Sequence, residues 1–124
     1  MKYLHEEFST LKKLITETNY AILNIVSEHF PATQSILVEP YYLDAENTLI
    51  CFTDEQLPVA LHQEEFQVVV KCINRKKGNY IRMTGIASFQ NKSVKNAVLK
   101  SVLVIRILQM AWYYKHSGKV EFYQ

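Results

Sequence analysis

The chain has 124 residues, of which 48% are hydrophobic, and its formal net charge is only +2. That length suits one domain, and so apolar a composition with so little net charge argues against a disordered chain. The sequence contains no apolar run of about eighteen residues, and its first residues do not resemble a secretory leader. We therefore expect one globular domain over residues 1–124, located in the cytoplasm and without a membrane span.

Charge is distributed unevenly along the chain. Residues 1–70 carry eleven of the twelve acidic residues against three lysines, and residues 71–124 carry eleven basic residues against one glutamate. The two parts therefore have formal charges of −8 and +10. Such polarity suits an anionic ligand, an acidic surface on a partner subunit, or packing of the two parts against each other within one barrel.

The first 43 residues predict a helix and two strands. Apolar residues recur at spacings of three and four over 3–18, which predicts an amphipathic helix. The short apolar run 20–26 predicts a buried strand, and the segment 28–34, which contains a proline, predicts a connection. A second strand follows over 35–43, and Pro40 within it indicates an edge or a bulge because proline cannot donate to the ladder.

The middle of the chain predicts two more strands with a short helix between them. Turn residues at 44–47 predict a hairpin, which a strand over 48–53 completes. Asp54 then suits the N-cap of a short helix over 55–64. The run 66–74 is rich in valine and isoleucine and predicts another buried strand.

The last third of the chain predicts long strands and one more helix. A charged loop at 75–79 precedes a strand over 80–90, and a second short helix is expected over 91–101. Residues 102–114 either continue that helix or form a long strand, and their β-branched and aromatic residues favour the strand. A last short strand is expected over 119–123.

Together these elements predict a mainly β fold. Six or seven antiparallel strands, an N-terminal helix and two short connecting helices make a closed or split barrel. The two cysteines, Cys51 and Cys72, lie in predicted strands and are expected to be buried, reduced thiols. The four histidines are scattered, and none has a metal-ligand spacing with a cysteine or another histidine, so no metal site is expected.

The order of these elements resembles the FMN-binding split-barrel superfamily, which includes pyridoxamine 5′-phosphate oxidase. Members begin with a helix that leads into an apolar strand, and they continue with a strand that bears a threonine, here Leu49–Thr53. A later strand of the type aromatic-apolar-Arg-x-x-Gly-x-Ala corresponds to Tyr80–Ala87. The closing strand 102–114 and the tail 117–123 also look like those of short bacterial-type members, so the likeness covers nearly the whole chain from about Phe8.

The resemblance implies a homodimeric flavoprotein that holds FMN at the subunit interface and acts as an oxidase or reductase on a small molecule. A reduced pyridine nucleotide or a substrate amine would supply electrons, and the flavin would carry the redox chemistry. One departure concerns the phosphate, which members commonly hold with a lysine a few residues after the threonine. Here residues 54–59 contain two acids and no lysine or arginine, and Ser35–Tyr42 has only Glu39 as a charge. Pyridoxamine phosphate oxidase activity itself is therefore not expected.

The same resemblance implies four cofactor-binding candidates. The Thr53 hydroxyl would contact the phosphate, or else Thr53 simply ends a strand. Tyr41 lies on the hairpin that lines the flavin, and because strand neighbours face opposite ways, at most one of Tyr41 and Tyr42 would line the site. Arg82 would face the flavin or an anionic substrate across the dimer interface, or else be a solvated barrel residue. Trp112 would stack on the isoalloxazine ring, or else be an interface or core aromatic.

Other readings of the sequence stay open. A chain without the phosphate lysine would serve as a cofactor-poor binding module for another flat ligand, such as haem or a modified flavin. Nucleic-acid binding would use Lys71, Arg82 and the basic loop 75–77, although such loops are usually solvated surface. Arg106 interrupts an apolar run, so its burial would demand a ligand or an acid such as Glu39 as a partner.

Overall fold

A computed structural model describes residues 5–27, 30–44, 46–55, 65–74, 78–95, 98–114 and 120–123. One helix and seven strands lie within these ranges. They are, in chain order, α1 (His5–Thr16), β1 (Ala21–Ser27), β2 (Phe30–Leu43), β3 (Thr48–Thr53), β4 (Glu65–Asn74), β5 (Asn79–Lys95), β6 (Val98–Tyr114) and β7 (Val120–Tyr123).

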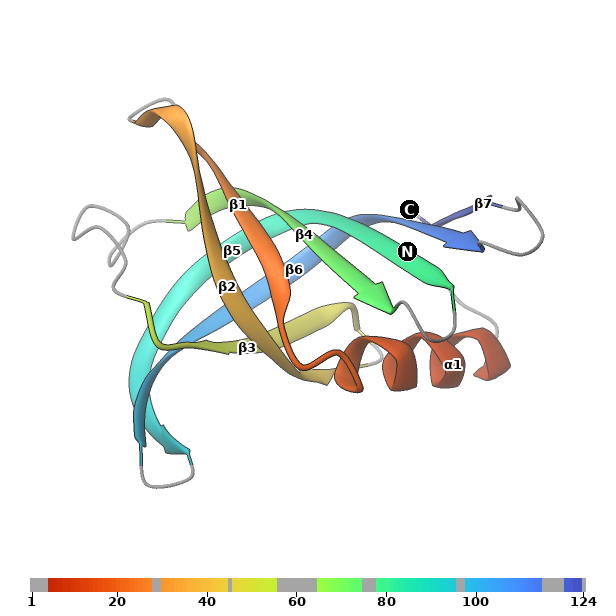
Figure 1. Ribbon diagram of the computed structural model, residues 1–124, viewed down its shortest axis with the longest axis horizontal. Helices are drawn as coiled ribbons and strands as arrows, with labels where there is room; N and C mark the ends of the chain where they lie inside the picture. The colour runs from red at the N-terminus through yellow and green to blue at the C-terminus, as the bar shows by residue number, and fades with distance from the viewer. Residues whose placement is uncertain are drawn as a thin grey trace.

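The strands form one antiparallel sheet that closes on itself (Figure 1). Their order is β3-β2-β1-β4-β5-β6-β7, and β3 also pairs with β6, from Thr48 opposite Arg106 to Thr53 opposite Ser101. Six strands therefore make a closed barrel, and β7 pairs with β6 beyond the part that β3 covers. The fold is the mainly β antiparallel barrel that the sequence predicts, with six strands in the closed part and β7 as a seventh strand of the sheet. Closure leaves the barrel strands without the exposed edges of an open sheet.

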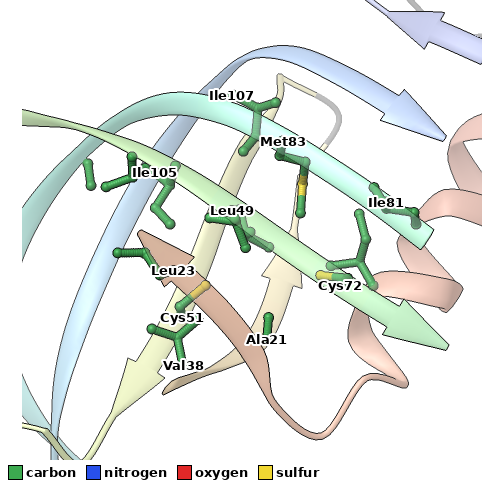
Figure 2. Close-up of a cluster of buried hydrophobic side chains, with 14 of the residues drawn as sticks. Ala21, Leu23, Val38, Leu49, Cys51, Cys72, Ile81, Met83, Ile105 and Ile107 are labelled. Atoms are coloured by element: carbon green, nitrogen blue, oxygen red, sulfur yellow. The ribbon is translucent and has the colours of Figure 1, made fainter. Parts of the chain in front are cut away.

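Alternation along the strands fills the barrel with apolar side chains. In β4, Phe66, Val68, Val70 and Cys72 are buried, whereas the residues between them are exposed or half-buried. Successive side chains of a strand point to opposite faces, so every second residue enters the core. Figure 2 shows side chains from several strands gathered in this interior, including those of Leu23, Val38, Leu49, Cys51, Ile81, Met83 and Ile105.

Both cysteines lie in this core as free thiols, as the sequence predicts. Burial raises the pKa of Cys72 from its ordinary value of 9.0 to about 12. Burial also raises the pKa of Cys51, and the neighbouring Cys72 raises it further. A thiol of raised pKa stays protonated in the folded protein and is a poor nucleophile at neutral pH.

We expect native protein not to react with a thiol reagent such as DTNB at about pH 8, and unfolded protein to react at both cysteines. Because the unfolded thiols ionise near 9 and the folded Cys72 only near 12, stability is expected to fall as pH rises through this window. Thiol titration with and without urea, and urea unfolding at several alkaline pH values, measure the two effects. Reaction of either thiol in the native protein within minutes would contradict the burial.

The helix α1 covers one end of the barrel (Figure 1). Leu11, Leu14 and Ile15 have the spacing of one helical face and are buried in the core, as the amphipathic pattern predicts. After the helix ends, Thr18 Oγ1 donates to the carbonyl oxygen of Leu14 at 3.0 Å. This bond satisfies one of the carbonyl groups that a helix C-terminus leaves without a backbone partner.

The β2–β3 hairpin turns at Asp44, as the sequence predicts. Asp44 Oδ1 accepts hydrogen bonds from the backbone N–H groups of Glu46 and Thr48, both at 2.9 Å. Asn47 adopts a positive φ of 69°, a conformation that asparagine tolerates better than most residues. The turn therefore aligns β3 so that Leu49 pairs with Leu43.

Pro40 lies at a β-bulge, as the sequence predicts. It pairs with Cys51, but the next pair joins Tyr42 to Ile50, so Tyr41 is the extra residue of β2. Both Tyr41 and Tyr42 are consequently exposed. The bulge interrupts the strict alternation of the strand, so both side chains are exposed, and the expectation that at most one of them lines a ligand site stays a prediction.

Two predicted segments are corrected by the structure. The helix expected over 91–101 is absent, since β5 continues to Lys95 and β6 begins at Val98. The pairs Ser93–Lys100 and Lys95–Val98 extend this hairpin, and cross-strand bonding there outweighs the local helical pattern.

The connection expected over 28–34 is also wrong beyond its first two residues. The strand β2 already starts at Phe30, which pairs with Ser27 of β1. A proline within a strand does not prevent pairing where its missing N–H is not needed. The helix expected over 55–64 lies almost entirely outside the described residues. The strands expected over 102–114 and 119–123 are confirmed as β6 and β7.

Candidate functional site

The end of β3 is held by a threonine. Thr53 is buried and pairs with Ser101 of β6. Its hydroxyl donates to the carbonyl oxygen of Leu37 at 2.9 Å and accepts from the backbone N–H of Glu55 at 3.1 Å. Thr53 therefore fastens the end of β3 to β2 and sets the path of the chain that follows.

Glu55 completes this fastening. Its Oε2 atom accepts a hydrogen bond from the backbone N–H of Leu37. Past the end of β3, the N–H and the carbonyl group of Leu37 would face no strand on this side. The carboxylate of Glu55 and the hydroxyl of Thr53 thus take the places that a longer β3 would supply.

A pocket of about 270 Å³ opens at this end of β3. Its walls combine apolar and aromatic side chains with charged ones. They are Tyr20, Leu37, Glu39, Phe52, Thr53, Asp54, Glu55 and Lys100. Concave surfaces with an apolar wall and a few polar groups are typical of small-molecule sites.

Among the described residues that line this pocket, one cation, Lys100, contacts two of the three carboxylates. Lys100 Nζ lies 3.5 Å from Glu39 Oε2 and 3.5 Å from Asp54 Oδ1, and its side chain is 14% exposed. Desolvation lowers the pKa of Lys100, but the charges and hydrogen bonds of Asp54 and Glu39 raise it, and the net shift is upward. Lys100 therefore stays protonated and is already committed to two acids.

Tyr41 lies beside the pocket through its contact with Phe52. The two rings meet edge to face, with centroids 5.0 Å apart and planes at 72°. Tyr41 is 55% exposed, so its side chain lies at the surface beside the pocket. Tyr42 faces a different neighbour, because Lys12 of α1 lies 4.5 Å above its ring.

Trp112 and Arg82 lie at the other end of the barrel. Trp112 belongs to the core, is 5% exposed, and donates from Nε1 to Asn79 Oδ1 at 2.8 Å. Arg82 is exposed on the outside of β5, opposite Lys71 on one side and Ala111 on the other. The two side chains thus belong to opposite faces of the sheet.

The structure therefore divides the four predicted contacts into two groups. Thr53 pairs with residue 101 of β6, whereas Arg82 pairs with residue 111. Ten residues of strand span about 33 Å. Thr53 and Tyr41 are brought together, and within one chain Arg82 and Trp112 do not reach them.

Two further predictions concern Arg106 and the basic loop 75–77. Arg106 is exposed on the outside of β6, so the expectation that burial would demand a partner does not apply. Glu39, its expected partner, pairs instead with Lys100. The basic loop 75–77 lies outside the described residues.

Sequence reasoning did not identify Glu55 and Lys100. A signal for Glu55 existed, because a threonine hydroxyl often bonds the N–H two residues later. The signal for Lys100 was hidden by the helix expected over 91–101. Only the pairing of Ser101 with Thr53 places Lys100 beside the end of β3.

Two further properties concern the part of the chain that the structure describes. No helix in it is long and apolar enough to cross a membrane. Nor does it contain a group of three or more His, Cys, Asp or Glu side chains placed to hold a metal ion.

The closed six-stranded antiparallel barrel, with a helix across one end and a pocket where β3 ends, defines the chain as a split β-barrel protein. The sequence matches no protein-family model and no curated protein. Solved structures nevertheless share the fold. A Clostridium acetobutylicum protein related to general stress protein 26 of B. subtilis, of the pyridoxinephosphate oxidase family, superposes with a TM-score of 0.72 at 8% identity, covering 98% of this chain and 96% of that one.

Two other solved structures agree. A general stress FMN/FAD-binding protein from Xanthomonas citri gives a TM-score of 0.63 at 9% identity, covering 98% of this chain and 97% of that one. HupZ of group A Streptococcus superposes with a TM-score of 0.62 at 16% identity, covering 96% of this chain and 99% of that one. The chain therefore has the split-barrel fold of these proteins, as its sequence resemblance implies.

Proposed function

We propose that this chain is a flavin-binding oxidoreductase that acts on a small molecule as a cytoplasmic homodimer. The observation that carries the proposal is the pocket at the end of β3, with Tyr20, Leu37 and Phe52 in its wall and the exposed ring of Tyr41 beside it. Flat aromatic ligands suit such walls. A protein of the same fold is described as FMN/FAD-binding.

Two features support the homodimer. The outside of the barrel carries exposed apolar side chains, among them Ile22, Val26 and Leu108, and a hollow of about 490 Å³ that Val26 and Leu108 help to line. Exposed apolar side chains around a hollow commonly mark an interface. In addition, a site that uses both Thr53 and Arg82 needs two copies, because about 33 Å of β6 separates their partners within one chain.

The chemistry would belong to the bound flavin, which takes up and passes on electrons when bound. The chain would supply a flat wall that orients the ring, and this wall would exclude water from one side of the ring. A reduced pyridine nucleotide or a small amine would reach the ring from the open side, beside Tyr41. FMN is the flavin that the fold is named for, but the residues around Thr53 do not suit its phosphate, because the Thr53 hydroxyl, the Leu37 N–H and Lys100 already have partners within the chain.

The proposal predicts that riboflavin or FMN added to the protein loses fluorescence on binding. Tyr41→Ala is expected to weaken binding about fivefold, because an aromatic contact contributes about 1 kcal/mol. Tyr42→Ala is the matched control, since that ring packs against Lys12 instead, and it is expected to leave the affinity within about twofold.

Sedimentation velocity of the same samples should give the mass of a dimer. Two results would count against the proposal. The first is constant fluorescence of both flavins over the whole titration. The second is equal loss of affinity in the Tyr41 and Tyr42 variants, which would place the ring elsewhere.

A further inference from the structure

We propose that the pocket at the end of β3 selects a flavin ring that carries no phosphate ester, because the chain's own Glu55 carboxylate holds the place of the phosphate. The expected ligand is an uncharged isoalloxazine with a free polyol chain, the chemistry of riboflavin. This inference rests on the proposed flavin site and adds the form of flavin that the site accepts.

The first argument concerns the hydrogen-bond donors. A phosphate at the end of β3 would need the hydroxyl of Thr53, the N–H of Leu37 and a cation. The Thr53 hydroxyl donates to the carbonyl oxygen of Leu37. The Leu37 N–H donates to Glu55, and the ammonium group of Lys100 lies between Glu39 and Asp54. Each of these three groups already has a partner within the chain.

The second argument concerns charge. Among the described residues, Glu39, Asp54 and Glu55 line the pocket together with one cation, Lys100, so the formal charge of this lining is minus two. The FMN phosphate is itself a dianion at neutral pH, so it would enter a field of its own sign. The two acids that Lys100 contacts also keep it protonated, so its charge is fully present and still does not balance the three carboxylates.

The third argument concerns what the pocket does favour. Leu37 and Phe52 supply an apolar wall for a ring, and the carboxylates of Glu39 and Glu55 are hydrogen-bond acceptors. A polyol chain offers several hydroxyl donors, and hydroxyl-to-carboxylate bonds are charge-assisted. The volume of about 270 Å³ holds part of such a ligand, so the rest of it would lie outside the pocket, towards Tyr41.

The test compares riboflavin with FMN by fluorescence quenching at neutral pH. Wild-type protein is expected to bind riboflavin at least about tenfold more tightly than FMN. Raising the ionic strength from about 0.01 M to about 0.15 M should tighten FMN binding by screening the repulsion and leave riboflavin binding unchanged.

Two variants isolate the carboxylate. Glu55→Gln keeps an amide oxygen that accepts from Leu37 but removes the charge. It is expected to strengthen FMN binding several-fold and to weaken riboflavin binding, because a bond from the polyol chain to an amide oxygen is not charge-assisted. Glu46→Gln makes the same charge change in the β2–β3 turn, at the opposite end of β3, and should alter neither affinity. Far-UV circular dichroism confirms that both variants are folded.

The outcomes separate this inference from the proposed function. Tighter binding of FMN than of riboflavin by the wild type would overturn the inference and leave the flavin site in place. An unchanged preference in Glu55→Gln would overturn the role of Glu55. Binding of neither flavin to any variant would overturn the proposed function itself, and the inference with it.

Discussion

Replacing Gly85 with alanine is expected to destabilise the barrel by about 3 kcal/mol, because the new methyl group has no space. A Cβ atom at Gly85 would lie 2.3 Å from the carbonyl oxygen of Arg106 and 3.2 Å from Cγ2 of Ile105. The nearest atom belongs to the backbone of the paired strand β6, so no change of side-chain rotamer relieves the overlap. Relief requires β5 and β6 to separate where their pairing already shifts register, between Thr84 and Gly85.

Urea unfolding followed by Trp112 fluorescence measures this loss, and thermal unfolding should show a fall in Tm of roughly 10–15 °C. Thr84→Ala is the matched control, because Thr84 directly precedes Gly85 in β5 and is half-buried. This variant is expected to be less stable than the wild type by no more than about 1 kcal/mol. Equal stability of Gly85→Ala and the wild type would show that the strands do not approach each other as closely as described.

Ile105→Ala is expected to cost about 3–4 kcal/mol by opening a cavity in the barrel. Ile105 is fully buried in β6, where it pairs with Leu49 on one side and Ala87 on the other (Figure 2). Two losses reduce the free energy of unfolding. The removed atoms no longer contribute their transfer free energy, and a cavity remains because the strands bonded on each side of β6 cannot move into the space.

The matched control is Ile73→Ala. The same atoms are removed from a side chain of β4 that is 50% exposed, so we expect a loss below about 1 kcal/mol. Denaturant midpoints at constant m-value provide the comparison. Similar losses at Ile105 and Ile73 would contradict the burial of Ile105 inside a closed barrel.

Much of the barrel could be predicted from local patterns. The alternation in 66–74 and the turn chemistry of 44–47 each depend on residues close in sequence, and both predictions are confirmed. The helix expected over 91–101 was wrong because its apolar spacing suits a helix, yet pairing between Ser93 and Lys100 keeps both strands extended. A helical pattern is recognised within about ten neighbouring residues, whereas cross-strand hydrogen bonds depend on residues farther away in the sequence.

The candidate site was predictable only in part. Thr53 was identified through the family resemblance, and the acids that follow it were recognised as unsuited to a phosphate. Lys100 was missed, because it reaches Glu39 and Asp54 only when β6 pairs with β3. The separation of Arg82 from Thr53 was not predictable either. Their partners on β6, residues 111 and 101, lie far apart, and this pairing cannot be deduced from spacing in the sequence.

The sequence by itself determined the class of fold, since strand alternation, the amphipathic helix and the turn at Asp44 are local consequences of side-chain chemistry. Tertiary structure alone decided the closure of β3 on β6, the outward position of both Tyr41 and Tyr42, and the commitment of Lys100 and the Leu37 N–H to acids of the chain. The physical reason is that these features arise from contacts between strands distant in sequence, whose register and bulges exist only once the barrel has closed.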